Sequence, residues 1–446
     1  MSSELQKLWE HAGGQLPADW TIAPLESFFR DAKGIAVGVM YPGPDTPGGT
    51  PLLKVGDIKD GVALRPTYCI SAATDEEHRR TKLVGDELLI TLVGNPGECI
   101  VVTPEMVGWN PARAIAVIRL QDISLRTYLK TVLESTAGRH LIDAVLNTTV
   151  QKTLNLKDIR KLPIPLPTDA EIKWISGISE ALTNRITLLR ETNATLEAIA
   201  QALFKSWFVD FDPVRAKMQG RAPQGMDEAT AALFPDGLEE SALGSVPKGW
   251  RVQSLDTIAA FLNGLALQKF PPTGHSDLPI IKIAQLRKGN SVGSDQASRN
   301  IKPEYVVKNG DVLFSWSGSL EVEIWCGGEG ALNQHLFKVT SEAFPKWFYF
   351  FWTRHHLADF RQTAASKATT MGHIQRGHLT AAKVCISTAA VLNAANSVLE
   401  PIVAILIQNS LQAQSLVTLR ETLLPRLISG QLHLHPDVSE HTAVIV

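Results

Sequence analysis

The spacing of hydrophobic positions predicts one long helix in each half of the chain. In the first half, apolar residues between Leu182 and Leu203 recur at steps of four and three, which is the heptad spacing of a helix that packs on another helix. This stripe consists of Leu182, Ile186, Leu189, Leu196, Ala200 and Leu203, with Asn193 as its polar member. The second stripe consists of Val398, Ile402, Ile405, Leu416, Leu419 and Leu423, with Asn409 and Gln412 as polar members. We expect the two helices to form an antiparallel coiled coil whose asparagines fix the register.

A mixed segment of strands and turns is predicted before each helix. Short apolar runs such as Glu87 to Val93 and Ala114 to Leu120 are separated by Gly, Pro and Asn, which is typical of strands joined by turns. The proline-rich segment Leu162 to Pro167 is incompatible with a helix, so we expect Asp169 to cap the helix that follows. A helix from Asp169 to Asp210 would be about 60 Å long.

The two halves also repeat each other in sequence. The repeated pairs, in chain order, are Leu16–Trp20 with Val246–Trp250, Pro51–Lys54 with Pro279–Lys282, Val84–Leu89 with Asn309–Phe314, and Leu196–Phe204 with Leu416–Leu424. Four pairs in the same order indicate a duplicated unit rather than chance. We therefore divide the chain into a first globular domain (1–167), a helix (168–210), a connector (211–245), a second globular domain (246–388), a second helix (389–432) and a tail (433–446). A short helix is expected within the connector, near Glu228 to Leu233.

Charge is distributed unevenly along the 446 residues, although the net charge is only −2. The near-neutral total argues against nucleic-acid binding, which usually needs a basic surface. Residues 246–389, however, contain 16 Lys and Arg against 10 Asp and Glu, a net charge of +6. Residues 16–167 are neutral, and residues 168–245 carry −5. The acidic groups are thus concentrated between the domains, and the second domain retains a charge suited to a phosphate backbone.

Motifs of the common catalytic and metal sites are missing from the sequence. There is no phosphate-binding G-x-x-x-x-G-K-[ST], no G-x-S-x-G and no H-E-x-x-H. We interpret His355-His356 and His433/His435 as packing or surface residues, because no carboxylate or cysteine stands at ligand spacing. The four cysteines are far apart, the N-terminus is polar, and the apolar run Ile402 to Ile407 is short. We expect a cytoplasmic protein that does not enter a membrane.

Three segments resemble one protein family. Ala202 to Val214 (ALFKSWFVDFDPV) is similar to the central conserved region of the specificity subunits of type I restriction-modification systems. Leu419 to Leu432 (LRETLLPRLISGQL) is similar to the end of the family's second conserved region, and Leu162 to Pro167 to the passage from a recognition domain into its helix. The second half departs from the pattern, because Val384 to Thr388 replaces the proline-rich run.

The resemblance implies an α+β fold with two tandem α/β-type target-recognition domains, related by a pseudo-twofold repeat. Each domain would read one half of a bipartite double-stranded DNA target, and the paired helices would set the spacer between the half-sites. The resemblance also implies partners: two copies of a modification (methyltransferase) subunit that holds S-adenosylmethionine, and restriction (motor-nuclease) subunits that use ATP and Mg. No catalytic residue, metal or cofactor is expected on this chain.

Candidate DNA-binding residues follow from the resemblance and from their polar chemistry. They lie in the loop after the Gly-Asp-x-Leu strand and in the polar loop before the closing helix of each domain. In the first half they are Thr91, Asn95, Thr148, Thr149, Gln151 and Lys152, beside Gly94. In the second half they are Ser315, Ser317, Ser319, Lys367, Thr369, Thr370, His373, Gln375 and Arg376, together with Gln285, Arg287 and Lys288 after the repeated Pro-x-x-Lys strand.

Two other functions stay open at this point. The chain would be a DNA nuclease or a fused modification enzyme if its active site lacks a familiar motif. It would be a coiled-coil scaffold without a DNA role if the basic residues serve only solubility. Activity of the isolated chain distinguishes the first alternative, and salt-dependent binding to duplex DNA distinguishes the second.

Overall fold

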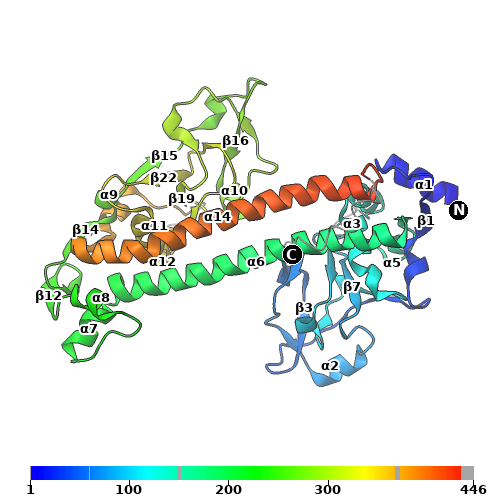
Figure 1. The fold of residues 1–446 in the computed structure, drawn as a ribbon, viewed down its shortest axis with the longest axis horizontal. Helices are drawn as coiled ribbons and strands as arrows, with labels where there is room; N and C mark the ends of the chain where they lie inside the picture. The colour runs from blue at the N-terminus through cyan, green and yellow to red at the C-terminus, as the bar shows by residue number, and fades with distance from the viewer. Residues whose placement is uncertain (1, 60, 148–151, 367–371, 433–446) are drawn as a thin grey trace. The chain divides into compact units, whose positions relative to one another are not determined.

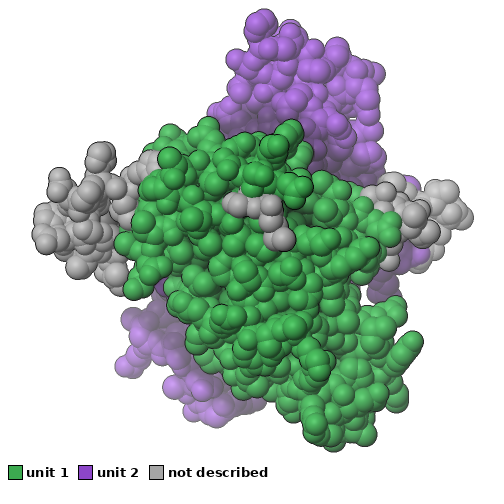
Figure 2. Space-filling view, turned by 90° about the vertical axis from the view of Figure 1, so that its right-hand side faces the viewer, with its two compact units in different colours: residues 1–185, 416–446 green, residues 186–415 purple. Residues whose placement is uncertain are grey.

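The computed structural model describes residues 2–59, 61–147, 152–366 and 372–432. The chain divides into two compact units, which Figure 2 colours separately. Unit 1 contains residues 1–185 and 416–446, and unit 2 contains residues 186–415. Because the division falls inside both long helices, each unit combines a globular domain with a segment of each helix.

Unit 1 is built on a four-stranded antiparallel sheet. Its strand order is β2 (Ile35–Val37), β10 (Ile115–Arg119), β7 (Glu87–Thr91) and β8 (Cys99–Val101). A second sheet has the order β6 (Cys69–Ile70), β3 (Thr50–Leu53) and β9 (Asn110–Pro111), with β3 parallel to β9. The remaining elements are α1 (Ser2–His11), β1 (Thr21–Pro24), β4 (Ile58–Lys59), β5 (Val62–Ala63), α2 (Ala72–Glu77), α3 (Arg126–Glu134), α4 (Thr136–Ala144), α5 (Leu156–Arg160) and β11 (Pro163–Leu166), and β1 pairs with β11.

Unit 2 repeats this arrangement. Its four-stranded antiparallel sheet has the order β15 (Ala260–Asn263), β22 (Leu336–Thr340), β19 (Val312–Ser315) and β20 (Val322–Ile324). The second sheet has the order β17 (Gln296–Ala297), β16 (Leu278–Ile281), β21 (Gly330–Leu332) and β18 (Val306–Val307), with β16 parallel to β21. The other elements are β14 (Arg251–Ser254), α9 (Leu255–Ile258), α10 (Ile283–Lys288), α11 (Lys346–His355), α12 (Leu357–Ser366), α13 (Arg376–Ala381) and β23 (Lys383–Ile386), and β14 pairs with β23.

The mixture of sheets and helices confirms the α+β class expected from the sequence (Figure 1). The central sheet of each unit holds the repeated Gly-Asp-x-Leu strand, β7 or β19, between two antiparallel neighbours. The side chains of β7 are all buried, as are those of β19, because helices cover one face of each sheet and the second sheet covers part of the other. The repeated sequence therefore builds the same strand order twice.

Two long helices follow the globular domains, α6 (Asp169–Phe204, 36 residues) and α14 (Ala389–Ile428, 40 residues). The start of α6 differs from the prediction, because Thr168 rather than Asp169 caps it. The Thr168 hydroxyl accepts a hydrogen bond from the Glu171 backbone N–H, and the Glu171 carboxylate accepts one from the Thr168 N–H at 3.0 Å. This reciprocal pair is a capping box, in which the acidic residue stands three positions after the cap.

Inside unit 2, the two helices contact each other through a polar cluster. The Asn193 side-chain amide donates to the Leu406 carbonyl at 2.9 Å and to the Ser410 hydroxyl at 3.0 Å, and Asn409 donates to the Asn193 amide oxygen at 2.9 Å. On the α6 side, the predicted apolar stripe is buried or half-buried throughout. These hydrogen bonds require one alignment of the helices, since a slip of either helix separates the asparagines.

The predicted stripe on α14 is only partly buried, because Ile402, Leu416 and Leu423 are half-buried whereas its other three apolar members are exposed. Val398, Ile405 and Leu419 are 42%, 43% and 47% exposed. The residues that α14 buries instead are Ala395, Leu399, Val403, Leu406 and Ala413. Apolar residues occupy every position from 402 to 407, so hydrophobicity alone does not identify the contact face.

By length and composition, α14 would also pass as a membrane-spanning helix. A single helix of this kind is weak evidence, because core helices of soluble proteins meet the same criteria. Val391, Ala395, Leu399 and Val403 of α14 belong to the unit 2 core, which accounts for part of the apolar character of this helix.

An aromatic core accounts for the segment Ala202–Val214 that carries the family resemblance. After α6, residues Lys205–Val209 form one π-helical turn that places Phe208 inside unit 2. Its ring centroid lies 5.6 Å from that of Trp347, 5.9 Å from that of Trp250 and 5.9 Å from that of Phe348. Phe211 follows with φ = 58°, a left-handed conformation that is uncommon for a bulky residue and turns the chain into the connector.

The connector is folded onto unit 2. It forms α7 (Asp212–Met218), α8 (Glu228–Ala232), β12 (Leu238–Ser241) and β13 (Gly244–Pro247), and α8 confirms the short helix predicted near Glu228. Val214 and Phe234 belong to the same core as Phe208. Acidic residues of the connector satisfy local backbone groups, as Asp227 does by accepting from the Thr230 N–H at 2.8 Å.

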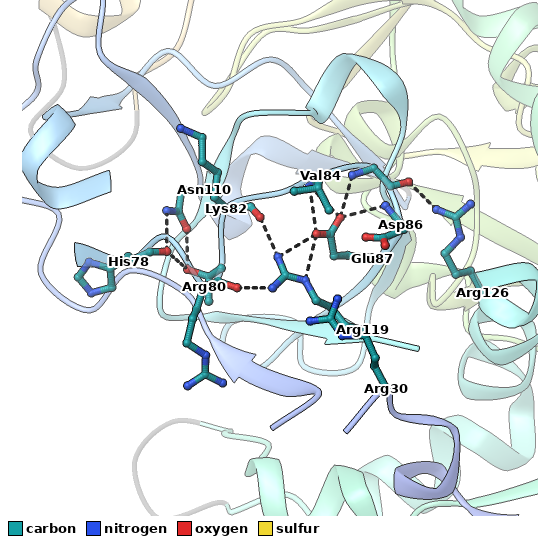
Figure 3. Close-up of polar contacts among 12 residues, drawn as sticks. Arg30, His78, Arg80, Lys82, Val84, Asp86, Glu87, Asn110, Arg119 and Arg126 are labelled. Carbon is teal, nitrogen blue, oxygen red and sulfur yellow. Dashed lines mark hydrogen bonds and ion pairs between the residues drawn. The ribbon is translucent and has the colours of Figure 1, made fainter. Parts of the chain in front are cut away.

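A buried ion pair closes one end of the unit 1 sheet (Figure 3). Glu87 is fully buried at the start of β7 and accepts hydrogen bonds from the backbone N–H groups of Val84, Gly85 and Asp86 at 3.0–3.1 Å. The Arg119 guanidinium, at the end of β10, donates to the Glu87 carboxylate at 3.0 Å and to backbone carbonyls of residues 80 and 82. In unit 2 the neighbouring motif position serves the same purpose, because Asp311 pairs with Lys338 of β22 at 2.8 Å. The Gly-Asp-x-Leu segment thus anchors its strand by a charge pair in both units, through Glu87 in unit 1 and Asp311 in unit 2.

Candidate nucleic-acid interface

The two candidate loops of unit 1 lie side by side at the other end of the sheet. The first follows β7 and the second precedes α5. Val93 and Thr153 form an antiparallel bridge, and the Leu154 N–H donates to the Leu92 carbonyl at 2.9 Å. Because these bonds join the backbones, the sheet holds both loops at one edge.

Unit 2 joins its corresponding loops in the same way. Ser317 and His373 form an antiparallel bridge, the Ile374 N–H donates to the Trp316 carbonyl at 3.0 Å, and the Gly318 N–H donates to the Gly372 carbonyl at 2.9 Å. We call this shared edge, where the loop after β7 or β19 meets the loop before α5 or α13, the loop edge of each unit.

The loop edge also contacts the turn after the repeated Pro-x-x-Lys strand. A side chain on Gly94 would lie 3.5 Å from Val55, and one on Gly318 would lie 3.5 Å from Ile283. Ile283 begins α10, whose last residues are the exposed Arg287 and Lys288. The structure therefore brings α10 to the loop edge of unit 2.

Some of the candidate DNA-binding residues have structural roles instead. Thr91 and Ser315 are fully buried, and each hydroxyl forms hydrogen bonds with backbone groups of its own loop. Thr91 donates to the Asn95 carbonyl and accepts from the Glu98 N–H, while Ser315 donates to the Ser319 carbonyl at 2.6 Å and accepts from the Glu321 N–H at 2.7 Å. We correct the expectation for both residues, because a hydroxyl used in this way shapes the loop and does not face a ligand.

Gln285 and Ser317 need the same correction. Gln285 is 6% exposed, and its amide oxygen accepts from the Lys282 N–H at the start of α10. Ser317 is 3% exposed, and its hydroxyl is 2.9 Å from Nδ1 of His335. Both were expected to contact DNA because they are polar, but each is buried with its polar group bonded inside the fold, so its polarity needs no ligand.

The remaining described candidates are exposed. They are Asn95, Lys152, Arg287, Lys288, Ser319, His373, Gln375 and Arg376. Arg376 is the most strongly held of them, because its guanidinium lies 5.7 Å from the centroid of the Phe337 ring and donates to the Phe261 carbonyl at 3.2 Å. The candidates Thr148, Thr149, Gln151, Lys367, Thr369 and Thr370 lie outside the described residues.

The loop edge of unit 2 contains a polar cluster that the sequence did not suggest. The Trp316 indole N–H donates to the Asn263 side-chain oxygen at 3.0 Å and to the Gln334 carbonyl at 3.1 Å. The His335 ring lies 6.1 Å from the Trp316 ring and the His373 ring 6.2 Å from it, measured between centroids. The available signal was the run Asn333-Gln334-His335 directly before an apolar strand, where three polar residues mark the strand end.

The described residues contain no group of three His, Cys, Asp or Glu side chains placed to hold a metal ion. His355 and His356 pack against Trp352 instead, with ring centroids at 5.5 and 6.0 Å. Burial lowers the pKa of both imidazoles, so both are neutral at pH 7. The packing role expected for this pair agrees with these contacts.

Comparison with known proteins points to one family. The chain is 29% identical over 198 residues to the specificity subunit of the type I restriction enzyme EcoBI from Escherichia coli, which is 42% of each chain. It is 23% identical over 353 residues to the HindI specificity subunit from Haemophilus influenzae, covering 68% of this chain and 74% of that one. The match to the first of these relatives therefore spans less than half of its length. No family model matches the chain.

A solved structure has a similar fold. The crystal structure of the type I restriction-modification S subunit from M. genitalium superposes with a TM-score of 0.53 and 14% sequence identity. The alignment covers 93% of this chain and 98% of that one. At this identity the likeness concerns the fold alone.

Proposed function

We propose that this chain, a homologue of type I restriction enzyme specificity subunits, is the DNA specificity subunit of a type I restriction-modification complex. Each unit would bind one half of a bipartite duplex target through its loop edge. The observation that carries the proposal is the repeated loop edge, since two domains of the same strand order each present exposed polar side chains on loops joined by backbone hydrogen bonds. Such residues on a rigid sheet suit base contacts in a groove.

The partners follow from the same proposal. Two copies of a modification subunit would bind the helical part of the chain and supply S-adenosylmethionine, and restriction subunits would supply ATP and Mg. Exposed apolar residues on the paired helix segments of unit 2 support a docking role, namely Leu188, Ile199, Val398 and Ile405. This chain would hold no cofactor, catalyse no step itself and act in the cytoplasm.

Reconstitution with the modification subunit tests the function. The chain alone is expected to bind duplex DNA with an affinity that falls as salt rises, and to transfer no methyl group from S-adenosylmethionine. Addition of the modification subunit should produce methylated adenines within one bipartite sequence. Filter binding at several salt concentrations and sequencing of the methylated positions measure the two effects.

Three outcomes would contradict this proposal. Methyl transfer by the isolated chain would identify a modification enzyme, and Mg-dependent DNA cleavage by the isolated chain would identify a nuclease. Absence of salt-dependent duplex binding would identify a scaffold without a DNA role.

We further propose that α6 and α14 form an antiparallel coiled coil that sets the spacer. Seven residues inserted after Arg185 in α6 and seven before Leu416 in α14 would add two helical turns, about 10 Å, to both helices. The recognised spacer should lengthen by about 3 base pairs, since stacked bases rise 3.4 Å each along a strand. Insertion into α6 alone is the control, and it should abolish binding to the bipartite target by unpairing the helices. Altered half-site bases with an unchanged spacer would refute the proposal.

A further inference from the structure

The backbone hydrogen bonds allow the loop edges of the two units to be compared residue by residue. Gly38 and Gly264 are equivalent, because a Cβ on either would clash with a backbone oxygen, that of Pro111 at 2.0 Å or that of Asn333 at 2.2 Å. The residue after each glycine forms a parallel bridge, Val39 with Ala112 and Leu265 with Asn333.

Two of the equivalences follow directly from these contacts. Val37 is equivalent to Asn263, because each precedes its glycine. Arg113 is equivalent to Gln334, because each follows the bridged partner, Ala112 or Asn333. A second pair of hydrogen bonds extends the comparison to the loops. The Leu92 N–H donates to the Ala114 carbonyl at 2.7 Å, and the Trp316 N–H donates to the His335 carbonyl at 3.3 Å.

The equivalent positions have opposite chemistry in the two units. Unit 1 has Val37, Leu92 and Ala114 where unit 2 has Asn263, Trp316 and His335. Arg113 stands in unit 1 where Gln334 stands in unit 2, and its side chain is exposed. In the same region, unit 1 exposes Tyr41 and Met40, by 79% and 42%. Leu92 is buried, so the same backbone exposes Val37 and Arg113 in unit 1, where unit 2 exposes Asn263 beside the half-buried Gln334.

The polar side chains of unit 2 are held in fixed orientations. The Trp316 indole N–H donates to the side-chain oxygen of the exposed Asn263. The amide nitrogen of Asn263 therefore points away from the indole. That nitrogen has no hydrogen-bond partner among the described residues. The His335 ring is placed between the Ser317 hydroxyl, 2.9 Å from Nδ1, and the Gln334 amide, 3.4 Å from Nε2. Donors fixed in this way lose little side-chain entropy on binding.

We propose that unit 2 reads its half-site by hydrogen bonds from Asn263 and Gln334, with His335 and Trp316 positioning them, whereas unit 1 reads by apolar contact and Arg113. The inference rests on the proposed function and adds how each half-site is distinguished. The Asn263 amide N–H groups suit base edges that carry acceptors in the major groove, such as purine N7, guanine O6 or thymine O4. An apolar surface suits the thymine methyl group.

Selection from a random duplex library tests this assignment. The probe is the purified chain with its modification subunit, and bound duplexes are sequenced. Asn263→Asp keeps the oxygen that accepts from Trp316 but removes the two N–H donors, and Gln334→Ala removes the second amide. Each variant should lose preference at one or two positions of a single half-site and lose about tenfold to a hundredfold in affinity for the wild-type target. The other half-site should stay unchanged.

Gln268→Ala is the matched control, because Gln268 is an exposed amide of unit 2 that lies outside the cluster. It should select the same sequence as the wild type. Selection of the wild-type sequence by both cluster variants, or an equal loss on all sequences, would overturn the assignment. If the wild-type complex selects no bipartite sequence, the proposed function fails as well, so the two failures are distinguishable.

Discussion

Replacement of Phe208 by Ala is expected to destabilise unit 2 by about 3–5 kcal/mol, the usual cost of deleting a buried phenyl ring. Phe208 is fully buried, and its ring contacts Phe204, Trp250, Trp347 and Phe348. These partners come from α6, α11 and the turn before β14, so a cavity at this position affects three parts of the unit together. Calorimetry should show the unfolding transition of unit 2 about 10 °C lower.

The control for this substitution is Leu188→Ala on α6, the helix that leads into this turn. Leu188 is 52% exposed, and its replacement should change the stability by about 0.5 kcal/mol or less. An equal shift for the two variants would show that the π-helical turn does not depend on the aromatic core. The same measurement tests whether the segment Ala202–Val214 stabilises unit 2, since Phe208 lies at its centre.

Glu87→Gln is expected to destabilise unit 1 by about 3 kcal/mol, because breaking a buried ion pair leaves the other charge uncompensated. The substitution would leave the Arg119 guanidinium, 17% exposed, beside a neutral group. It would also point the side-chain N–H groups of the glutamine toward the backbone N–H groups that now donate to the Glu87 carboxylate. Urea unfolding of the purified chain measures the loss.

The matched control is Glu329→Gln in unit 2. Glu329 pairs with Arg299 at 3.0 Å, but both side chains are about half exposed. Water screens such a pair, so the cost should stay below about 1 kcal/mol. A similar small cost for Glu87→Gln would mean that the sheet end is held by its backbone alone.

The fold was predictable from the sequence wherever a pattern of apolar and polar residues fits only one structure. The repeated segments gave the same strand order in both units, and the α6 stripe packs as its spacing indicates. The stripe on α14 was right for only half of its apolar members, because the buried Val403 and Leu406 lie among equally apolar residues that are exposed, such as Ile405. The helix cap failed by one position, since Thr168 and Asp169 are both good caps and only the Glu171 contact distinguishes them.

The candidate site was predictable at the level of loops but not of side chains. Polar residues near a strand end are either exposed or bonded within the fold, and the sequence does not separate Thr91 from Asn95 in this respect. The cluster around Trp316 was missed because Asn263 and Gln334 are 71 positions apart in the sequence and meet only through the pairing of β15 with β22. Equivalent positions in the two units share a backbone path rather than a residue type, which sequence comparison alone does not detect.

The buried hydroxyls of Thr91 and Ser315 have a consequence for how such a protein can diversify. Each hydroxyl fixes the path of its loop through backbone groups, whatever side chains the loop carries outward. Exposed residues such as Asn95 and Ser319 can then be exchanged without refolding the loop. If each unit reads one half-site as proposed, a lineage would acquire a new target sequence through a few surface substitutions in one unit, while the unchanged unit would preserve half of the old one.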